Sequence, residues 1–240
     1  MKNKNPLYAA WKKMGLVRDP WGGWREPMRD LRTDADTHAA VMELGSIVMS
    51  RKSLVRRYAW AIPSTAAIKW IAERCPEIIE IGAGRGYWAM LLANAGVDIL
   101  AFDQAGRGQK ISRNPYHYIP QSEIDQKLKE NPEAYRPFES EFVGQTDHAF
   151  YPVQFGRAKI AAEHPDRTLM LCWPPYSSPF ANDCLKYYHG QQVLFIGEHD
   201  GATGSKAFFN RLDRDWQEIG ECSIPQWIGM HDAIWLYQRK

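Results

Sequence analysis

Three glycines at positions 82, 84 and 86 stand together between two apolar runs of the chain. The run before them, Glu77–Ile81, predicts a strand, and the run after them, Tyr87–Ala95, predicts a helix. A glycine lets the backbone turn sharply and lets a ligand approach the bare main chain. The free N–H groups at a helix N-terminus attract anionic or polar atoms. The pattern therefore predicts a loop that binds a polar ligand.

Two carboxylates accompany this loop. Glu80 lies in the strand before it, and Asp103 follows a second predicted strand, Val97–Phe102. An acidic residue at the end of that strand can accept both hydrogen bonds from a ribose diol. Dinucleotide-binding loops need a third small residue, and this chain has the bulky Tyr87 there. A different nucleoside ligand is therefore favoured, with other nucleotides or an unliganded tight turn as alternatives.

The order Glu-x-Gly-x-Gly-x-Gly over Glu80–Gly86 resembles motif I of the class I S-adenosylmethionine-dependent methyltransferases. The resemblance implies that Gly82, Ala83, Gly84 and Gly86 wrap the amino-acid end of S-adenosylmethionine. It implies that Glu80 helps to hold the methionine amine, and that Asp103, with Gln104 beside it, holds the ribose.

A second segment, Trp173-Pro174-Pro175-Tyr176, follows the predicted strand at 168–173. Two prolines remove two N–H donors, so the loop presents carbonyl acceptors. It resembles motif IV of the amino-methyltransferases, in which Asp, Asn or Ser precedes Pro-Pro and an aromatic residue. The resemblance implies that Trp173 and the Pro174 carbonyl face the substrate and that Tyr176 stacks on it. Trp173 departs from that pattern because indole has a donor and no acceptor, which weakens the case for adenine methylation.

Glu198 is the fourth expected catalytic residue. It follows the predicted strand Gln192–Gly197 together with His199, and either could act as a general base. The pairs Asp147-His148 and His231-Asp232 are weaker candidates, since such residues are more often surface or capping groups. Trp60 either closes over the site or packs in the core.

Strands and helices alternate along most of the chain, which is typical of an α/β fold. We expect a Rossmann-like, seven-stranded, mixed but mostly parallel sheet with helices on both faces, plus an N-terminal helical extension. The expected divisions are an aromatic and helical extension over 1–63 and a methyltransferase domain over 64–240 with an insertion at 104–147. Within the extension, residues 1–32 are expected to be loop-like, and a helix is expected from Thr33 to Val48. The other expected strands and helices are strands at 150–155, 216–223 and 233–238, and helices at 64–72, 158–163, 180–188 and 206–212.

Composition bounds the other possibilities. The chain has 240 residues, of which 45% are hydrophobic and 24% charged, so it can build a core and is not disordered throughout. No apolar run is long enough to span a membrane, and no secretory signal is visible at the N-terminus. The four cysteines include no C-x-x-C pair, so no metal site and no disulfide framework is expected, and we predict a cytoplasmic protein.

The net charge of +2 is too close to neutral to indicate a nucleic-acid partner by itself. Residues 1–75 nevertheless carry 14 Lys and Arg against 7 Asp and Glu, with a cluster at Arg51, Lys52, Arg56 and Arg57. Three hypotheses follow. The leading one is methyl transfer to a small-molecule substrate that is small or flat. The second is methylation of nucleic acid bound by the basic cluster, and the third is a non-catalytic protein that binds the cofactor or serves as a scaffold.

Overall fold

The computed structural model describes residues 5–18, 24–25, 51, 53–55, 57–104, 149–199 and 201–240. The helix expected over 33–48, the pair Asp147-His148 and the expected insertion apart from Gln104 lie outside these residues.

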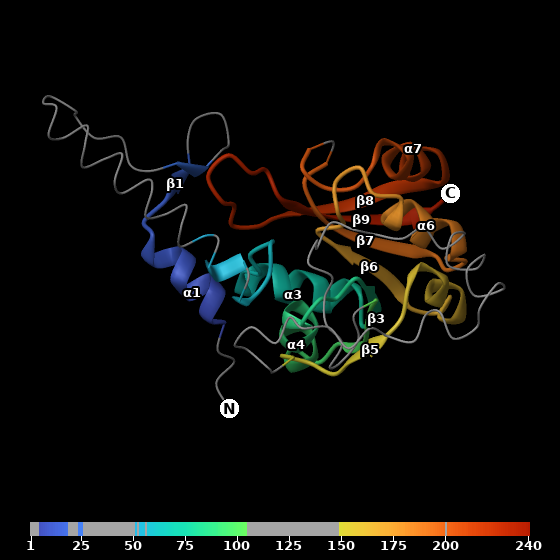
Figure 1. Ribbon diagram of the computed structural model, residues 1–240, viewed down its shortest axis with the longest axis horizontal. Coiled ribbons are helices and arrows are strands. Elements are labelled where there is room, and N and C mark those ends of the chain that lie inside the picture. Colours follow the sequence, from blue (N-terminus) through green and yellow to red (C-terminus); the bar gives the residue numbers. More distant parts are fainter. Residues whose placement is uncertain are drawn as a thin grey trace, which may run out of the picture.

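Seven strands form one mixed sheet in the order β5-β4-β3-β6-β7-β9-β8 (Figure 1). The five strands from β5 to β7 are parallel to one another, whereas β9 is antiparallel to both β7 and β8. The strands are β3 Glu77–Ile81, β4 Asp98–Asp103, β5 Val153–Phe155, β6 Thr168–Cys172, β7 Gln192–Gly197, β8 Trp216–Ser223 and β9 Ala233–Arg239. The expected fold class is therefore confirmed.

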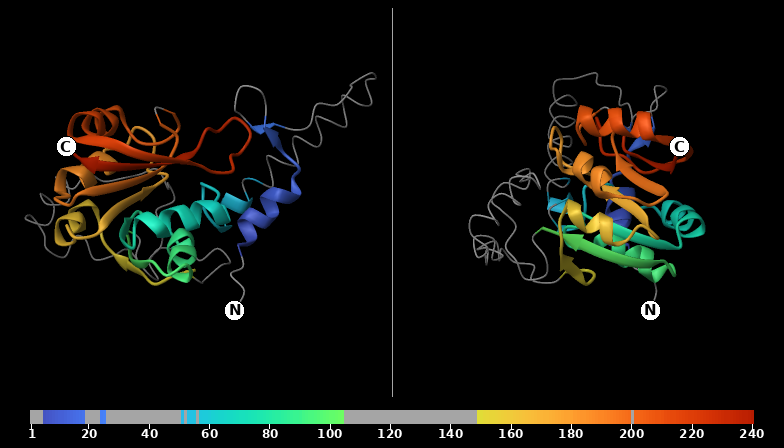
Figure 2. Two further views of the ribbon diagram at one scale, coloured as in Figure 1. Left: turned by 180° about the vertical axis from the view of Figure 1, so that it is seen from behind. Right: turned by 90° about the vertical axis from the view of Figure 1, so that its right-hand side faces the viewer.

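Helices cover both faces of this sheet (Figure 2). One face carries α3 (Thr65–Arg74) and α4 (Tyr87–Asn94), and the other carries the 3-10 helix η1 (Ala158–Glu163), α6 (Phe180–Tyr187) and α7 (Lys206–Asp215). Each face has its own hydrophobic core, because alternate residues of a strand point to opposite faces. Ligands in such sheets bind outside the carboxyl ends of the strands, where the strand order reverses, which here is between β3 and β6.

Local sequence signals explain several element ends. The Ser64 hydroxyl accepts the Ala67 N–H at 3.1 Å and so caps α3. This helix ends at Arg74, just before Cys75 and Pro76. Gly96 follows α4 with φ +95°, a conformation that glycine readily adopts at a helix C-terminus.

The N-terminal segment differs from the expectation. Residues 1–32 were predicted to be loop-like, but helix α1 covers Pro6–Lys13 and packs against the main body (Figure 1). The Asn5 side chain accepts the Tyr8 N–H at 3.1 Å, and a proline in the first turn is pre-shaped for a helix. The Trp11 indole N–H donates to the Gln226 carbonyl at 2.9 Å, so this aromatic side chain ties α1 to the main body. Two short strands follow α1 and pair antiparallel, β1 Val17–Arg18 and β2 Trp24–Arg25.

All four cysteines are free thiols. Within the described residues, no helix combines the length and the apolar character needed to cross a membrane.

Candidate functional site

The glycine loop joins β3 to α4 at the carboxyl edge of the sheet. Gly82, Gly84 and Gly86 have φ values of +82°, +55° and +72°, which residues other than glycine rarely adopt. The N–H groups of Gly82 and Ala83 both donate to the Phe102 carbonyl, at 2.8 and 3.0 Å. These bonds hold the first half of the loop against the end of β4.

The three glycines differ in what surrounds them. A Cβ atom at Gly82 would lie 2.8 Å from the Phe180 ring, and one at Gly86 would lie 2.8 Å from the Tyr151 Cβ. At Gly84 the same atom would meet no atom of the described residues within 4 Å. Gly82 and Gly86 therefore permit close packing, whereas Gly84 presents bare main chain to open space. A ligand can approach the loop at Gly84.

Asp103 lies beside this open position. Its Oδ2 atom accepts the Gly84 N–H at 2.9 Å, so the carboxylate at the end of β4 and the middle of the glycine loop are in direct contact. Gln104 follows directly, and both side chains are half-buried. The structure thus brings together the two features that the sequence predicts to bind a nucleoside.

Glu80 lies deeper, on β3, and is 2% exposed. Its Oε2 atom has no hydrogen-bond partner among the residues that the structure describes. Burial, and to a smaller extent the negative charge of Asp103, raise the pKa of this carboxyl group to about 8. A buried acceptor without a donor is costly, and a ligand that brings a cationic N–H group would remove that cost.

A second group of polar side chains lies farther along the same edge. Cys172 ends β6, Glu198 follows β7 and Asp232 precedes β9. Because Ile196 pairs with both Cys172 and Ile234, these three residues project from the sheet face that also carries Glu80. Burial raises the pKa of the Cys172 thiol well above its ordinary value, and the nearby charges of Glu80 and Asp232 add to this effect. Cys172 therefore lies close to both carboxyl groups.

Asp232 is completely buried. Its Oδ1 atom accepts the Trp173 indole N–H at 2.8 Å, whereas Oδ2 has no partner within the described part of the chain. Burial raises the pKa of Asp232 to about 7, with a further contribution from the charge of Glu198, while the Trp173 hydrogen bond and the charges of Arg51 and His231 act in the opposite direction.

The proline loop after β6 is held from two sides. Trp173 has φ +52°, its backbone N–H donates to the Ile196 carbonyl at 2.7 Å, and its ring stacks on Trp60 with centroids 4.6 Å apart. The Pro174 carbonyl accepts the Gly204 N–H at 2.9 Å. Of the loop residues 173–176, Tyr176 is the one most available to a substrate, since it is 66% exposed. The Pro174 carbonyl thus already accepts one hydrogen bond from within the chain. The Trp173 side chain has a single donor, and that donor is already bonded to Asp232.

Glu198 is held by backbone donors. Its Oε1 atom accepts the His231 N–H at 2.8 Å, and its Oε2 atom accepts the Ala202 N–H at 2.6 Å. These bonds join the loop after β7 to the residues before β9. The neighbouring His199 packs between the rings of Phe209 and Trp235. This geometry favours Glu198 as a clamp between loops over Glu198 as a mobile base.

Sequence reasoning undervalued Asp232, which was expected to be a surface or capping residue. Its position before an antiparallel strand places it at the edge where the parallel strands end, but strand order cannot be read from spacing. Nothing in the sequence indicated Gln226, and the side chain of this residue donates to the backbone carbonyl of Asp232 at 2.9 Å.

Lys52 and Arg56 of the basic cluster lie outside the described residues. The charge of Arg51 acts on the buried Asp232. Arg57 lies over the Tyr58 ring at 5.5 Å, and its carbonyl accepts a hydrogen bond from Arg85. Arg51 and Arg57 therefore both interact with groups of their own chain.

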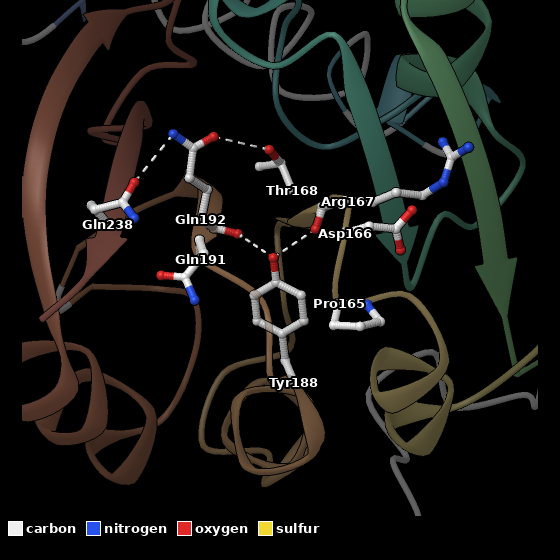
Figure 3. A pocket seen from close by; sticks show the side chains of 8 residues that line it. All are labelled: Pro165, Asp166, Arg167, Thr168, Tyr188, Gln191, Gln192 and Gln238. Carbon is white, nitrogen blue, oxygen red and sulfur yellow. Dashed lines mark hydrogen bonds between the residues drawn. The ribbon is translucent and has the colours of Figure 1, made fainter.

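A hollow at the opposite edge of the sheet is lined by residues such as Arg167, Thr168, Gln191 and Gln238 (Figure 3). The Tyr188 hydroxyl lies within hydrogen-bond distance of the carbonyls of Arg167 and Gln192, at 2.6 and 2.9 Å. The Gln192 side chain bonds to Thr168 and Gln238. These groups satisfy one another and join the amino ends of the parallel strands, so this hollow serves the fold. Within the described residues, no group of three or more His, Cys, Asp or Glu side chains could hold a metal ion.

No protein-family model and no curated protein matches this chain. Solved structures with a related fold include magnesium protoporphyrin IX methyltransferase from Synechocystis PCC 6803 with bound S-adenosyl-homocysteine, at 9% identity over 97% of this chain and 94% of that chain, with a TM-score of 0.40. Another is TrmK from M. capricolum in complex with S-adenosyl-homocysteine, at 12% identity, 74% and 69% coverage and a TM-score of 0.40. A third is a putative tRNA (m1A22) methyltransferase from Streptococcus pneumoniae in complex with S-adenosyl-L-methionine, at 12% identity, 74% and 73% coverage and a TM-score of 0.40. Similarity this weak assigns neither a ligand nor a reaction to this chain.

Proposed function

We propose that this chain is an S-adenosylmethionine-dependent methyltransferase that acts on a small or flat substrate. The observation that carries the proposal is the open main chain at Gly84, held in contact with Asp103 at the carboxyl edge of the sheet. The buried, unmatched Glu80 carboxyl group below the same loop adds a second feature that fits this cofactor.

Each of these residues has a separate task in the proposal. Gly84 leaves room for the cofactor against the loop, and Asp103 with Gln104 accepts hydrogen bonds from the ribose hydroxyls. Glu80 receives the positively charged methionine amine. A positive charge beside Glu80 favours the ionised carboxylate, so cofactor binding lowers the pKa of this group from about 8.

Bound S-adenosylmethionine would supply a methyl group on a sulfonium, which passes to a lone pair of the substrate while the electrons of the broken C–S bond stay on sulfur. The chain then has to align the substrate, and alignment alone can supply much of the rate. Tyr176 and Trp173 lie on the loop after β6, next to the point where the strand order reverses. We assign them to the substrate side, with the Pro174 carbonyl as a backbone support of that loop.

The proposal is tested by thermal unfolding with S-adenosyl-homocysteine. At a hundredfold excess over its dissociation constant, a ligand stabilises the folded state by ~2.7 kcal/mol, and each kcal/mol raises the Tm of a chain this long by ~2–4 °C. We expect a shift of several degrees in the natural protein and a much smaller shift in Asp103→Ala. The matched control is Asp213→Ala, which removes an exposed carboxylate of α7 and should leave the full shift.

The absence of a shift in the natural protein would reject the cofactor. A full shift in Asp103→Ala would remove Asp103 from the site. Transfer itself is tested by incubating the protein with methyl-labelled cofactor and pools of small aromatic amines, phenols and acids. Labelled product supports the enzyme, whereas cofactor binding without product in any pool would favour a protein that only binds the cofactor.

A further inference from the structure

Three buried acceptor oxygens have no donor among the described residues: Glu80 Oε2, Asp232 Oδ2 and Gln226 Oε1. The proposed function uses Glu80 alone. The other two belong to adjacent groups, because the Gln226 side-chain N–H donates to the Asp232 carbonyl at 2.9 Å. Asp232 is 0% exposed and Gln226 is 8% exposed. An unmatched buried acceptor costs ~1–3 kcal/mol, so a pair of them indicates that donors are missing.

A ligand that supplies the missing donors should carry no negative charge, because two carboxyl groups already lie at this site. Asp232 lies near the carboxylate of Glu198, which is occupied by two backbone N–H groups. A ligand with N–H groups and a positive charge would satisfy the unmatched oxygens and also relieve the repulsion between Asp232 and Glu198. A hydroxyl or a carboxylate ligand would do neither as well.

Aromatic side chains border the same place. The Trp173 indole N–H is bonded to Asp232, and its ring stacks on Trp60 with an interplanar angle of 11°. The Trp60 carbonyl in turn accepts the Trp227 indole N–H at 2.8 Å, which fixes the backbone under this stack. Indole faces attract organic cations, most strongly where water is excluded.

The place lies on the substrate side of the proposed cofactor site. Glu80 lies on β3 and Asp232 precedes β9, so the sheet order β3-β6-β7-β9 places the two unmatched carboxyl groups on either side of the end of β6. Trp173 and Tyr176, which belong to the loop after this strand, follow directly.

We propose that Asp232, Gln226 and the Trp60–Trp173 pair form a subsite for a planar organic cation with N–H groups, such as an aromatic amidinium or ammonium. The inference rests on the proposed function, because it makes this cation part of the substrate that receives the methyl group. Asp232 supplies the acceptor that a tryptophan at position 173 cannot supply. Asp232 is fully buried and is bonded to the half-buried Trp173 indole, so the ligand has to displace neighbouring side chains as it enters.

Among the described residues, Arg51 is a competing donor, since its positive charge also acts on Asp232, as does the charge of His231, whose ring Nδ1 lies 3.3 Å from Glu198 Oε1. If the Arg51 guanidinium fills this position, the unmatched oxygens belong to an internal ion pair. The experiment therefore has to separate an external cation from Arg51.

Benzamidine is the probe, and benzamide is its uncharged match in shape. Both are titrated into the natural protein while the indole N–H signals are followed by NMR, with the Trp173 signal assigned through Trp173→Phe. We expect benzamidine to shift the Trp173 signal with a Kd of ~1 mM, a modest affinity for so small a ligand. Benzamide should bind at least tenfold more weakly. Asp232→Asn should weaken benzamidine at least tenfold, and Glu221→Gln, which alters an exposed carboxylate on β8, should leave it unchanged.

Three results would overturn the subsite: no binding of benzamidine to the natural protein, equal binding of benzamide, or undiminished binding in Asp232→Asn. Binding that appears only in Arg51→Ala would assign Asp232 to Arg51 and would also overturn it. S-adenosyl-homocysteine is titrated into the same samples. Benzamidine binding without cofactor binding would reject the proposed function and would leave a cation site, so the two failures are distinguishable.

Discussion

At the scale of single residues, Glu80 makes an unusual prediction, since its removal should stabilise the protein. The folded state keeps a proton on Glu80 up to about pH 8, whereas the unfolded chain loses it near the ordinary value of 4.5. At pH 7 the folded state therefore binds the extra proton, and glutamine imitates that protonated form. We expect Glu80→Gln to raise the Tm by several degrees at pH 7, at ~2–4 °C per kcal/mol, and to reduce the shift produced by S-adenosyl-homocysteine.

Glu77→Gln is the matched control, because Glu77 is exposed on the same strand. Its Tm and its response to S-adenosyl-homocysteine should both be close to those of the natural protein. A lower Tm in Glu80→Gln would show that Glu80 has a structural partner, contrary to the role given to it here.

Alanine substitutions at two glycines of the loop should affect ligand binding and stability to different degrees. Gly84→Ala places a methyl group in open space, so its stability cost is only that of left-handed backbone, ~1–2 kcal/mol. Gly82→Ala also meets the Phe180 ring and should cost a further ~1–3 kcal/mol. We nevertheless expect Gly84→Ala to weaken S-adenosyl-homocysteine binding more than Gly82→Ala does, as measured by calorimetry. Unchanged affinity in Gly84→Ala would mean that the cofactor does not approach the loop there.

At the scale of elements, the loop after β6 is positioned by its neighbours on both sides. The Trp173 side chain bonds to Asp232 before β9, and the Pro174 carbonyl bonds to Gly204 after β7. The left-handed conformation of Trp173, with φ +52°, is unfavourable by itself and persists because these contacts and the Trp60 stack hold it.

Trp173→Phe tests this arrangement, because phenylalanine retains a ring for the stack but has no N–H group for Asp232. We expect the free energy of unfolding, measured with urea, to fall by ~1–3 kcal/mol as the buried carboxyl group loses its donor. The same substitution should cost less in an Asp232→Ala background, because no acceptor is then left unmatched. Trp70→Phe, at a half-buried position of α3, is the control, and a loss as large there would show that indole size is what matters.

At the scale of the whole molecule, two buried acids determine how stability depends on pH. Glu80 and Asp232 keep their protons to about pH 8 and about pH 7 when folded, against ordinary values of 4.5 and 3.8 when unfolded. Over that window the folded state binds more protons than the unfolded chain, so stability falls as the pH rises. Among the described residues, the charged and titratable groups around Glu80 are Asp103 and Cys172, and those around Asp232 are Cys172, Glu198, His231 and Arg51.

We expect the Tm to be several degrees higher near pH 5 than near pH 8, and the double variant Glu80→Gln/Asp232→Asn to lose most of this slope. Exposed ion pairs lower the pKa of Asp98 and Asp215, and they weaken only as the pH falls below the ordinary range of those groups. Differential scanning calorimetry from pH 4 to pH 9 measures both effects. A slope that survives in the double variant would assign it to other groups.

The sequence alone determined the fold class and most element positions of the described residues. Strands at 77–81, 192–197 and 216–223 agree with the prediction to the residue, and the first two are apolar runs next to proline or glycine, which carry local information. The sequence also identified the glycine loop and Asp103 as one unit. A strand, a loop, a helix and a second strand in succession form a right-handed parallel unit, which places the loop and the end of the second strand at the same edge of the sheet. Helix α1 was missed although Asn5 and Pro6 form a start signal for it.

Only the tertiary structure decided which glycine faces open space, because that depends on Phe180 and Tyr151 from distant elements. It also decided that Trp173 turns its N–H to Asp232, 59 residues away, and that Glu198 is held by backbone donors. Burial and hydrogen-bond partners arise from the packing of segments that lie far apart in the chain, so spacing along the chain cannot encode them. The candidate cofactor loop could therefore be read locally, whereas the acceptor-rich subsite became visible only in the folded molecule.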